Sequence, residues 1–142
     1  DVVLATPTYA LYLGETAREL GVDLARTSIS TVIVSGEPGG SIPATRHAIE
    51  VLWSAKCYEL YGIAEIGPTN PGCPLQEGNH LCEDWYHALI VDESGNPVEY
   101  GDVGEHIVTS YIQDGQPLIK YRTHDLVRRT DRPCGCGTTW RP

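Results

Sequence analysis

Val32-Ile33-Val34, followed by Ser35-Gly36-Glu37-Pro38-Gly39-Gly40 and then Ser41-Ile42-Pro43, is the stretch that decides the fold. Three β-branched apolar residues in a row predict a short buried strand. The glycine- and proline-rich segment predicts a loop, and proline near a first helical turn predicts that a helix begins there. A strand that leads through such a loop into a helix is typical of an α/β sheet.

The segments on either side continue this pattern. Thr6-Pro7-Thr8 predicts a helix start, and Gly21 predicts its end. Apolar residues recur between them on roughly helical spacing, at Leu11, Leu13, Ala17 and Leu20. The helix after Pro43 is expected to bury Ile42, Thr45, Ile49 and Leu52. A second strand is predicted over 57–61, ending at Gly62. The order helix, strand, helix, strand predicts parallel pairing.

The chain changes character after Gly67, where prolines and glycines crowd a long loop. Short strands are predicted at about 86–91, 105–111 and 117–121, with another over 126–128 and a turn at Gly95-Asn96. We therefore expect an α/β part over 1–70, and a small distorted β-barrel-like part over 71–142.

Composition and charge exclude several classes of protein. The net charge of −9 argues against a general nucleic-acid binder. No apolar run is long enough for a membrane span. Residues 1–119 carry 17 acids and 4 bases, whereas 120–142 carry 2 acids and 6 bases. That basic tail comprises Lys120, Arg122, Arg128, Arg129, Arg132 and Arg141. It is most simply a solvated face, with an anionic ligand or an acidic docking domain as alternatives.

The chain begins without methionine and contains none. We expect it to be an internal piece of a longer protein. Five cysteines without a secretory signal argue against a disulfide framework and favour a cytoplasmic location.

Several short segments carry a family resemblance by their order and spacing. The first three are Ser35-Gly36-Glu37-Pro38-Gly39, Tyr61-Gly62-Ile63-Ala64-Glu65 and Tyr121-Arg122-Thr123-His124-Asp125-Leu126, and Gly101–Thr109 precedes the third as a Gly-Glu strand. Together they resemble the core motifs of the adenylate-forming enzymes. His80–Tyr86 and the ending Pro133–Thr139 narrow the resemblance to the phenylacetate–CoA ligase family. The resemblance covers essentially the whole chain.

The resemblance implies part of the large N-terminal domain, with a flavodoxin-like parallel sheet. It also implies roles for individual residues. The residues expected to line the adenine base and to stack on it are Gly36, Glu37, Pro38, Tyr61 and Gly62. The catalytic residue would be Glu65, as the magnesium ligand. Carboxylates suit Mg²⁺ because it prefers hard oxygen ligands.

Asp125 matches the ribose-binding aspartate, since an ionised carboxylate accepts from the two adjacent ribose hydroxyls. Arg122 is expected either to contact a phosphate or to pair with Asp125. Two positions depart from the usual pattern: Ala64 replaces a hydroxyl residue, and His124 stands where the family often has glycine. We expect Glu65, Asp125 and the Gly36–Pro38 turn to converge on one nucleotide.

The cysteines and one histidine form a candidate zinc site. Cys134-Gly135-Cys136 offers two soft ligands on one tight loop, and Cys73 and His80 could complete a tetrahedral set. Some members of the family bind a metal with such residues. Cys82, two residues after His80, is a reserve ligand, and unrelated free thiols are the alternative. Cys57 is interpreted as a buried strand residue.

The activity implied by the resemblance belongs to a longer parent protein. That protein would join an aryl acid such as phenylacetate to AMP, using ATP and Mg²⁺, and CoA would then attack the acyl-adenylate. Its phosphate loop and its mobile C-terminal domain would lie outside this sequence, so we expect the chain alone to be inactive. Its partners would be small molecules, with a homodimer left open. The alternatives are a relative that adenylylates a deazaflavin cofactor and a non-catalytic zinc-stabilised binding module.

Overall fold

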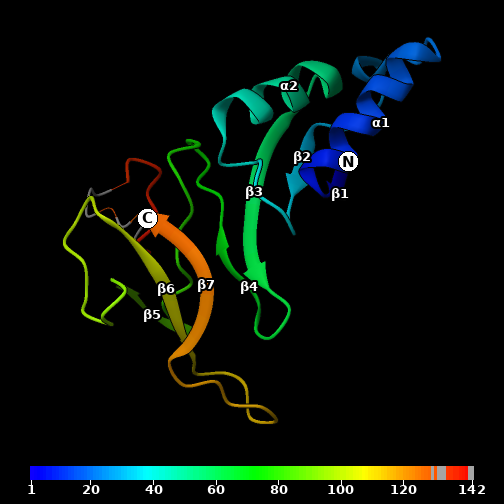
Figure 1. The fold of residues 1–142 in the computed structure, drawn as a ribbon. Coiled ribbons are helices and arrows are strands. Elements are labelled where there is room, and N and C mark those ends of the chain that lie inside the picture. The colour runs from blue at the N-terminus through cyan, green and yellow to red at the C-terminus, as the bar shows by residue number, and fades with distance from the viewer. Residues whose placement is uncertain (129, 131–133, 141–142) are drawn as a thin grey trace. The chain divides into compact units, whose positions relative to one another are not determined.

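The computed structural model describes residues 1–128, 130 and 134–140 of the chain (Figure 1). Arg129, Arg132 and Arg141 of the basic tail, and Pro133 of the cysteine-rich ending, lie outside the described residues. Two compact units are present, Asp1–Gly62 and Ile63–Pro142. The elements in order are β1 (Val2–Ala5), α1 (Pro7–Glu19), the 3-10 helix η1 (Leu24–Arg26), β2 (Thr31–Val34), α2 (Pro43–Trp53), β3 (Lys56–Ile63), β4 (Gly67–Pro71), β5 (Tyr86–Val91), β6 (Val103–Ser110) and β7 (Tyr121–Arg128).

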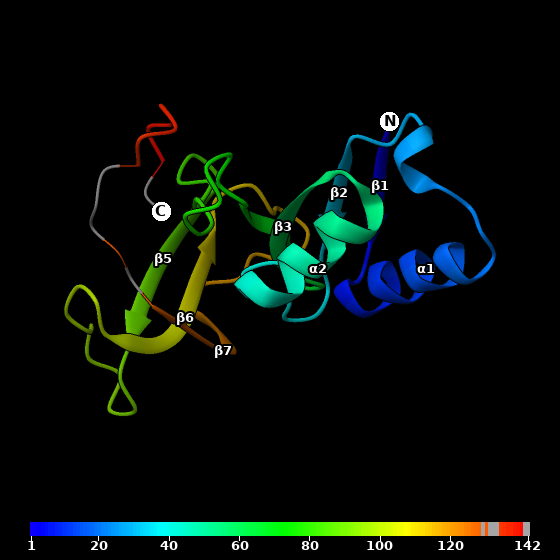
Figure 2. The same cartoon turned by 90° about the horizontal axis from the view of Figure 1, so that it is seen from above.

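The first unit is an α/β structure in which β1, β2 and β3 pair in parallel, in that order. This confirms the predicted parallel pairing and adds β1, a four-residue strand that was not predicted. Figure 2 shows β1 beside β2, with α1 joining them along the chain. The predicted helix after Thr6 is confirmed. The Thr6 side chain accepts a hydrogen bond from the backbone N of Tyr9, and the helix ends before Gly21, whose φ is +69°.

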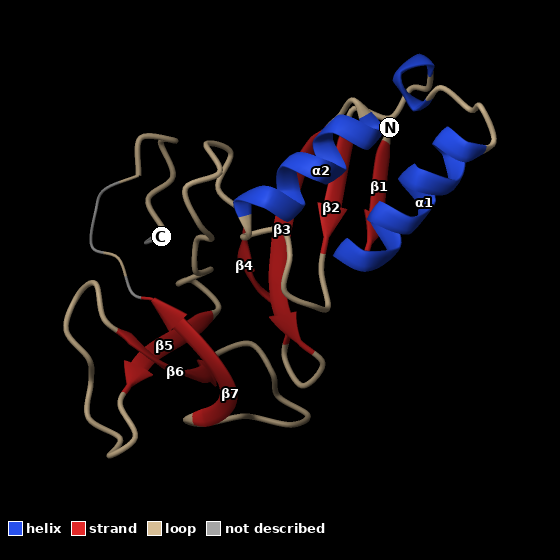
Figure 3. Cartoon of the chain, turned by 45° about the horizontal axis from the view of Figure 1, so that its top comes forward, coloured by secondary structure: helices blue, strands red, loops and turns tan. Residues whose placement is uncertain are grey.

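The core of this unit lies between the two helices and one face of its strands (Figure 3). Val32, Val34 and Cys57 from the strands and Ala10 and Ile49 from the helices have no exposed surface. The prediction for the buried side of α2 was partly wrong. Ile42 is 46 % exposed because it precedes the helix as its N-cap, and Trp53 is buried instead, with its Nε1 donating to the backbone O of Ala10 at 2.9 Å.

Two glycines of the Ser35–Gly40 loop are required by packing. A Cβ on Gly40 would lie 2.6 Å from Cγ2 of Val34 and 2.7 Å from Cβ of Glu59. A Cβ on Gly39 would lie 2.4 Å from Cβ of Pro7. The loop therefore packs tightly against the end of β2 and the start of α1, which holds its shape.

We predict that Gly40→Ala destabilises the protein by about 1–3 kcal/mol, because an added methyl in a close-packed site forces neighbours to shift. Urea unfolding followed by circular dichroism measures the effect. Gly115→Ala is the matched control, since nothing lies within 4 Å of a Cβ at that position. Equal stabilities of the two variants would show that the loop has room to relax.

The second unit is built mainly from antiparallel strands. β5 and β7 each pair with β6 to form an open three-stranded sheet in the order β5-β6-β7. The predicted β part is therefore confirmed as antiparallel β structure, but its three strands in the described residues form an open sheet and not a closed barrel. The predicted strand over 117–121 is wrong. Ile119 is 76 % exposed and precedes β7, which starts at Tyr121 and includes the predicted 126–128 segment.

The core of the second unit is small. Ile66, Cys82, Tyr86 and Val108 form its buried cluster, and the Tyr86 hydroxyl donates to the backbone O of Ile66 at 3.1 Å. Gly95, with φ of +84°, forms the predicted turn between β5 and β6. In the described part of the chain, no helix has the length and apolar character needed to cross a membrane.

Candidate nucleotide site and metal centre

In the first unit, the Gly36–Pro38 turn follows the C-terminal end of β2. Gly36 has a φ of +90° and is exposed, as is Pro38. The Glu37 carboxylate is already engaged, since its Oε1 accepts from the backbone N of Thr8 at 2.6 Å. Hydrogen bonds from the Thr8 side chain and backbone lower the pKa of Glu37. The carboxylate therefore anchors the turn to the start of α1, and the exposed surface at Gly36 and Pro38 is what a ligand would meet.

Tyr61 and Gly62 lie near the C-terminal end of β3 and are half-buried. Gly62 is the last residue of the first unit. The backbone then turns at 64–66, where the backbone N of Ile66 donates to the O of Ile63 at 3.3 Å.

Glu65 lies in this tight turn and its side chain is exposed. Its Oε1 accepts a hydrogen bond from the Tyr121 hydroxyl at 2.7 Å, and its backbone O accepts one from Nε2 of Gln113 at 2.9 Å. The Tyr121 hydrogen bond lowers the pKa of Glu65, and the same bond raises the pKa of Tyr121. Glu65 is thus an ionised, accessible carboxylate whose direction is set by Tyr121, which suits a magnesium ligand.

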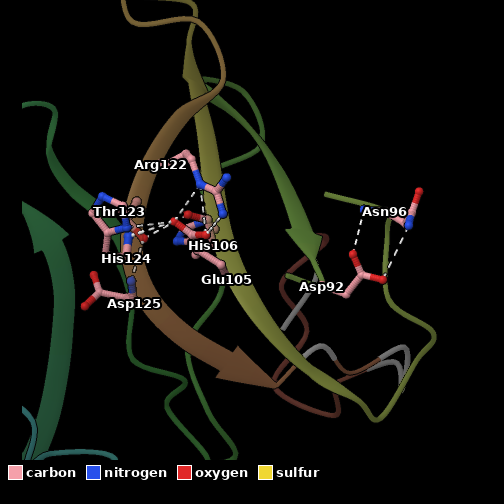
Figure 4. A network of polar contacts seen from close by, with 8 residues as sticks. All are labelled: Asp92, Asn96, Glu105, His106, Arg122, Thr123, His124 and Asp125. Atoms are coloured by element: carbon pink, nitrogen blue, oxygen red, sulfur yellow. Dashed lines mark hydrogen bonds and ion pairs between the residues drawn. The ribbon is translucent and has the colours of Figure 1, made fainter. Parts of the chain in front are cut away.

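Arg122 does not pair with Asp125 but with Glu105 of β6. Its Nε lies 3.0 Å from Oε2 and 3.2 Å from Oε1 of Glu105, and its Nη2 also donates to Oε2 (Figure 4). These hydrogen bonds, together with the charge of Arg122, lower the pKa of Glu105. From the sequence, Arg122 was expected either to contact a phosphate or to pair with Asp125. In the structure its partner is instead Glu105.

Asp125 lies in β7 on the opposite side of the strand from this pair, and its side chain is half-buried (Figure 4). Its backbone N donates to the Thr123 hydroxyl at 3.1 Å, and that hydroxyl donates to the backbone O of His106 at 2.8 Å. Strand β7 therefore carries Asp125 and, through Tyr121, also holds Glu65. The two predicted carboxylates are connected through one strand of the second unit.

The four predicted zinc ligands come together in the second unit. One ligand atom each from Cys73, His80, Cys134 and Cys136 lies within 4.8 Å of the others. Sγ of Cys73 is 3.3 Å from Sγ of Cys134, and Nε2 of His80 is 3.4 Å from Sγ of Cys136. With Zn–S bonds of about 2.3 Å, sulfurs at two corners of a tetrahedron lie about 3.8 Å apart. The cluster therefore has the size and the donor set of a closed structural zinc site.

The surroundings of the cluster orient its ligands. Nδ1 of His80 lies 3.0 Å from the backbone O of Trp140, a contact that directs Nε2 toward the cysteines. Burial acts to raise the pKa of Cys73. Hydrogen bonds from the backbone of Glu77 and from Cys134 and His80 outweigh that burial, so the pKa falls to about 6. A thiolate at neutral pH is the form that binds a metal.

Cys82, the reserve ligand, lies outside this group. It is 6 % exposed and packs with Ile66, Tyr86 and Val108 in the apolar core of the second unit. Burial raises its pKa, as expected for a structural thiol rather than a ligand. Neither His80 nor Cys82 lies in a strand.

Three partners of these residues were not singled out from the sequence as site residues: Glu105, Tyr121 and Gln113. Tyr121 and Glu65 are 56 positions apart, and Arg122 and Glu105 are 17 apart. Glu105 and Tyr121 do belong to recognised motifs, which is the signal that could have marked them. Gln113 lies in an exposed loop with no such signal.

The chain was compared with protein families and with individual known proteins. No protein-family model matches the chain. A phenylacetate–coenzyme A ligase of Thermus thermophilus is 32 % identical over 98 % of this chain and 32 % of its own length. One from Escherichia coli is 31 % identical over 90 % of this chain and 30 % of its own length. The chain thus spans about a third of the length of the curated relatives it matches.

Solved structures give the same result. An open form of 2-hydroxyisobutyryl-CoA ligase, in complex with 2-HIB-AMP and CoA, superposes with a TM-score of 0.92 at 29 % identity. The match covers 98 % of this chain and 33 % of that one. A benzoate CoA ligase from Burkholderia xenovorans shares the fold at a TM-score of 0.67 and 15 % identity, over 92 % of this chain and 29 % of its own. Over nearly all of its length, this chain is homologous to a segment of these phenylacetate–coenzyme A ligases that makes up about one third of their length.

Proposed function

We propose that this chain is the nucleotide-binding part of an AMP-forming carboxylate–CoA ligase, with an aryl acid such as phenylacetate as substrate. The carboxylate of the acid attacks the α-phosphorus of ATP, forming an acyl-adenylate and releasing pyrophosphate. The CoA thiol then attacks the acyl carbon, and AMP leaves. The first step converts a poor electrophile into a good one, and positioning and charge stabilisation supply most of such catalysis.

Each predicted residue has a place in this proposal. Gly36, Glu37 and Pro38, with Tyr61 and Gly62, would line the base, and Asp125 would accept hydrogen bonds from the ribose hydroxyls. Glu65 would bind the magnesium ion, which supplies charge neutralisation at the phosphates when bound. Arg122 would contact a phosphate from its position against Glu105, which binds its guanidinium.

The observation that carries the proposal is that one strand, β7, positions two acidic residues of the motifs. Glu65 is oriented by Tyr121 of β7, and Asp125 belongs to β7 itself. A strand that carries both groups would bring the metal ligand and the ribose ligand to the same nucleotide. The matched ligases support the class of reaction, since the CoA ligase of known structure binds an acyl-AMP and CoA.

A structural zinc ion is part of the same proposal. Cys73, His80, Cys134 and Cys136 would hold it, and three thiolates with one imidazole leave no position open for substrate. The ion would tie the loop at 72–80 to the segment at 134–140, two segments that the chain separates by more than 50 residues. Its role would be stability, because a small core gains from such a staple.

The test uses the full-length protein that contains this chain. Purified protein is incubated with ATP, Mg²⁺ and either phenylacetate, benzoate or 2-hydroxyisobutyrate, and pyrophosphate release is measured with and without CoA. We expect pyrophosphate release that depends on an acid, and a CoA thioester only when CoA is present. Thioester formation is followed by mass spectrometry.

Two results would contradict the proposal. Transfer of AMP to a deazaflavin, with no thioester from any acid, would favour the cofactor-adenylylating alternative. The absence of both reactions, together with no protection of the Asp125 or Tyr61 segments by ATP in hydrogen exchange, would favour a binding module.

A further inference from the structure

We infer that Glu105 is a positioning residue for Asp125: it holds the irregular segment of β7 in the one shape that presents the Asp125 carboxylate to the ribose. This inference rests on the proposed function, because it assumes that Asp125 binds the ribose hydroxyls.

The first observation is a wide irregularity between β6 and β7. Glu105 pairs with Leu126 and Ile107 pairs with Arg122, so His106 alone faces three residues of β7, from Thr123 to Asp125. Such bulges interrupt the ladder of backbone hydrogen bonds and redirect side chains, often beside functional sites. Asp125 therefore lies in a segment outside the regular register of the β6–β7 pairing.

The second observation is that side-chain oxygens accept hydrogen bonds from the backbone of this segment. Oε1 of Glu105 accepts from the backbone N of His124 at 3.2 Å, and the Thr123 hydroxyl accepts from the backbone N of Asp125 at 3.1 Å. His124 has a φ of +62°, in the left-handed region that a residue with a side chain adopts at a cost. The bond from its backbone N to Glu105 offsets part of that cost.

The third observation is that Glu105 binds β7 at two further points. It pairs with the Arg122 guanidinium, and Nδ1 of His124 lies 3.2 Å from Oε1 (Figure 4). The Glu105 side chain is only 12 % exposed, whereas those of Arg122 and His124 are 52 % and 81 % exposed. The largely buried Glu105 carboxylate therefore binds both Arg122 and His124 on one side of β7, and Asp125 projects from the other side.

The test measures recognition of the ribose rather than overall activity. In the full-length enzyme, kcat/KM is compared for ATP and 2′-deoxy-ATP, and likewise for 3′-deoxy-ATP. The ratio for each pair reports the contribution of one hydroxyl. We expect Glu105→Ala to reduce the preference for ATP by about tenfold, because a displaced carboxylate no longer meets the hydroxyl. Glu105→Gln keeps one acceptor oxygen and should retain an intermediate preference.

Asp92→Ala is the matched control. Asp92 is another carboxylate of the same sheet region, and it accepts from the backbone N of Asn96 at 2.8 Å in the turn after β5, away from the bulge (Figure 4). Its replacement should lower stability without changing the ratio. A general loss of packing would lower kcat/KM equally for ATP and its deoxy analogues.

The outcomes test the positioning role of Glu105 separately from the proposed ribose contact of Asp125. If Asp125→Asn removes the preference for ATP while Glu105→Ala leaves it intact, the positioning role is wrong and the proposed nucleotide site stands. If Asp125→Asn itself leaves the preference unchanged, Asp125 does not bind the ribose and the proposed site is wrong. If Glu105→Ala and Asp92→Ala reduce the preference equally, Glu105 is only structural.

Discussion

Replacing Glu65 by glutamine in the full-length protein is expected to lower kcat/KM for adenylate formation by about a hundredfold or more. The substitution keeps the volume and one oxygen but removes the negative charge that a magnesium ion needs. Loss of one electrostatic contact to the reacting centre costs about that factor in enzymes where it has been measured. The measurement is pyrophosphate release with the acid, across a range of Mg²⁺ concentrations.

The dependence on magnesium distinguishes this effect from a loss of folding. We expect the half-saturating Mg²⁺ concentration to rise in Glu65→Gln. Glu93→Ala, an exposed carboxylate in the turn after β5, should behave as the native protein. Tyr121→Phe, which removes the hydrogen bond to Glu65, should have a smaller effect of the same kind. Native activity of Glu65→Gln at limiting Mg²⁺ would remove Glu65 from the metal site.

Removal of the metal is the second large effect that we expect. Cys134→Ser or Cys136→Ser should abolish stoichiometric zinc in the purified protein and lower its stability by several kcal/mol. Zinc affinities in small structural sites correspond to about 10–16 kcal/mol, so the loss of one thiolate has a large effect on folding. Metal content by atomic emission and the melting temperature with and without a chelator are the two measurements.

Two other cysteines serve as controls for this experiment. Cys57 is fully buried in the first unit, where burial raises its pKa to about 11, and Cys57→Ala should leave the zinc content unchanged. Cys82→Ser introduces a hydroxyl into the core of the second unit, so it should reduce stability but keep the metal. If Cys134→Ser keeps the full zinc content, or if a chelator leaves the melting temperature of the native protein unchanged, the cluster is not a structural metal site.

The first unit was largely predictable because its signals are local. Thr6 and Pro7 begin α1, Gly21 follows its end, and the apolar run at 32–34 forms a strand with no exposed surface at Val32 and Val34. Each of these depends on neighbours in the sequence. The error at Ile42 has the same origin: the residue fits the helical spacing but precedes the first helical turn, so it is exposed.

The second unit was harder to predict because its strands are short and its pairing is not local. The segment 117–121 has apolar residues typical of a strand, yet Ile119 is exposed and the strand starts only at Tyr121. Strand ends and sheet closure depend on what a segment pairs with, and composition does not encode that. Likewise, the sequence predicted a distorted barrel-like form, and only the pairing of β5, β6 and β7 showed that these strands form an open sheet.

By itself, the sequence determined which residues are chemically able to act and in what order they occur: the acidic residues of the motifs, the Gly-Pro turn and the cysteine pair at 134 and 136. Only the tertiary structure decided their partners. It placed Cys73 and His80, and not the reserve ligand Cys82, beside that pair, it paired Arg122 with Glu105, and it set the Tyr121 hydroxyl against Glu65. The physical reason is that residue type sets the chemistry a side chain can perform. Its hydrogen bonds depend instead on strand register and loop path, which form only when segments far apart in the chain pack together.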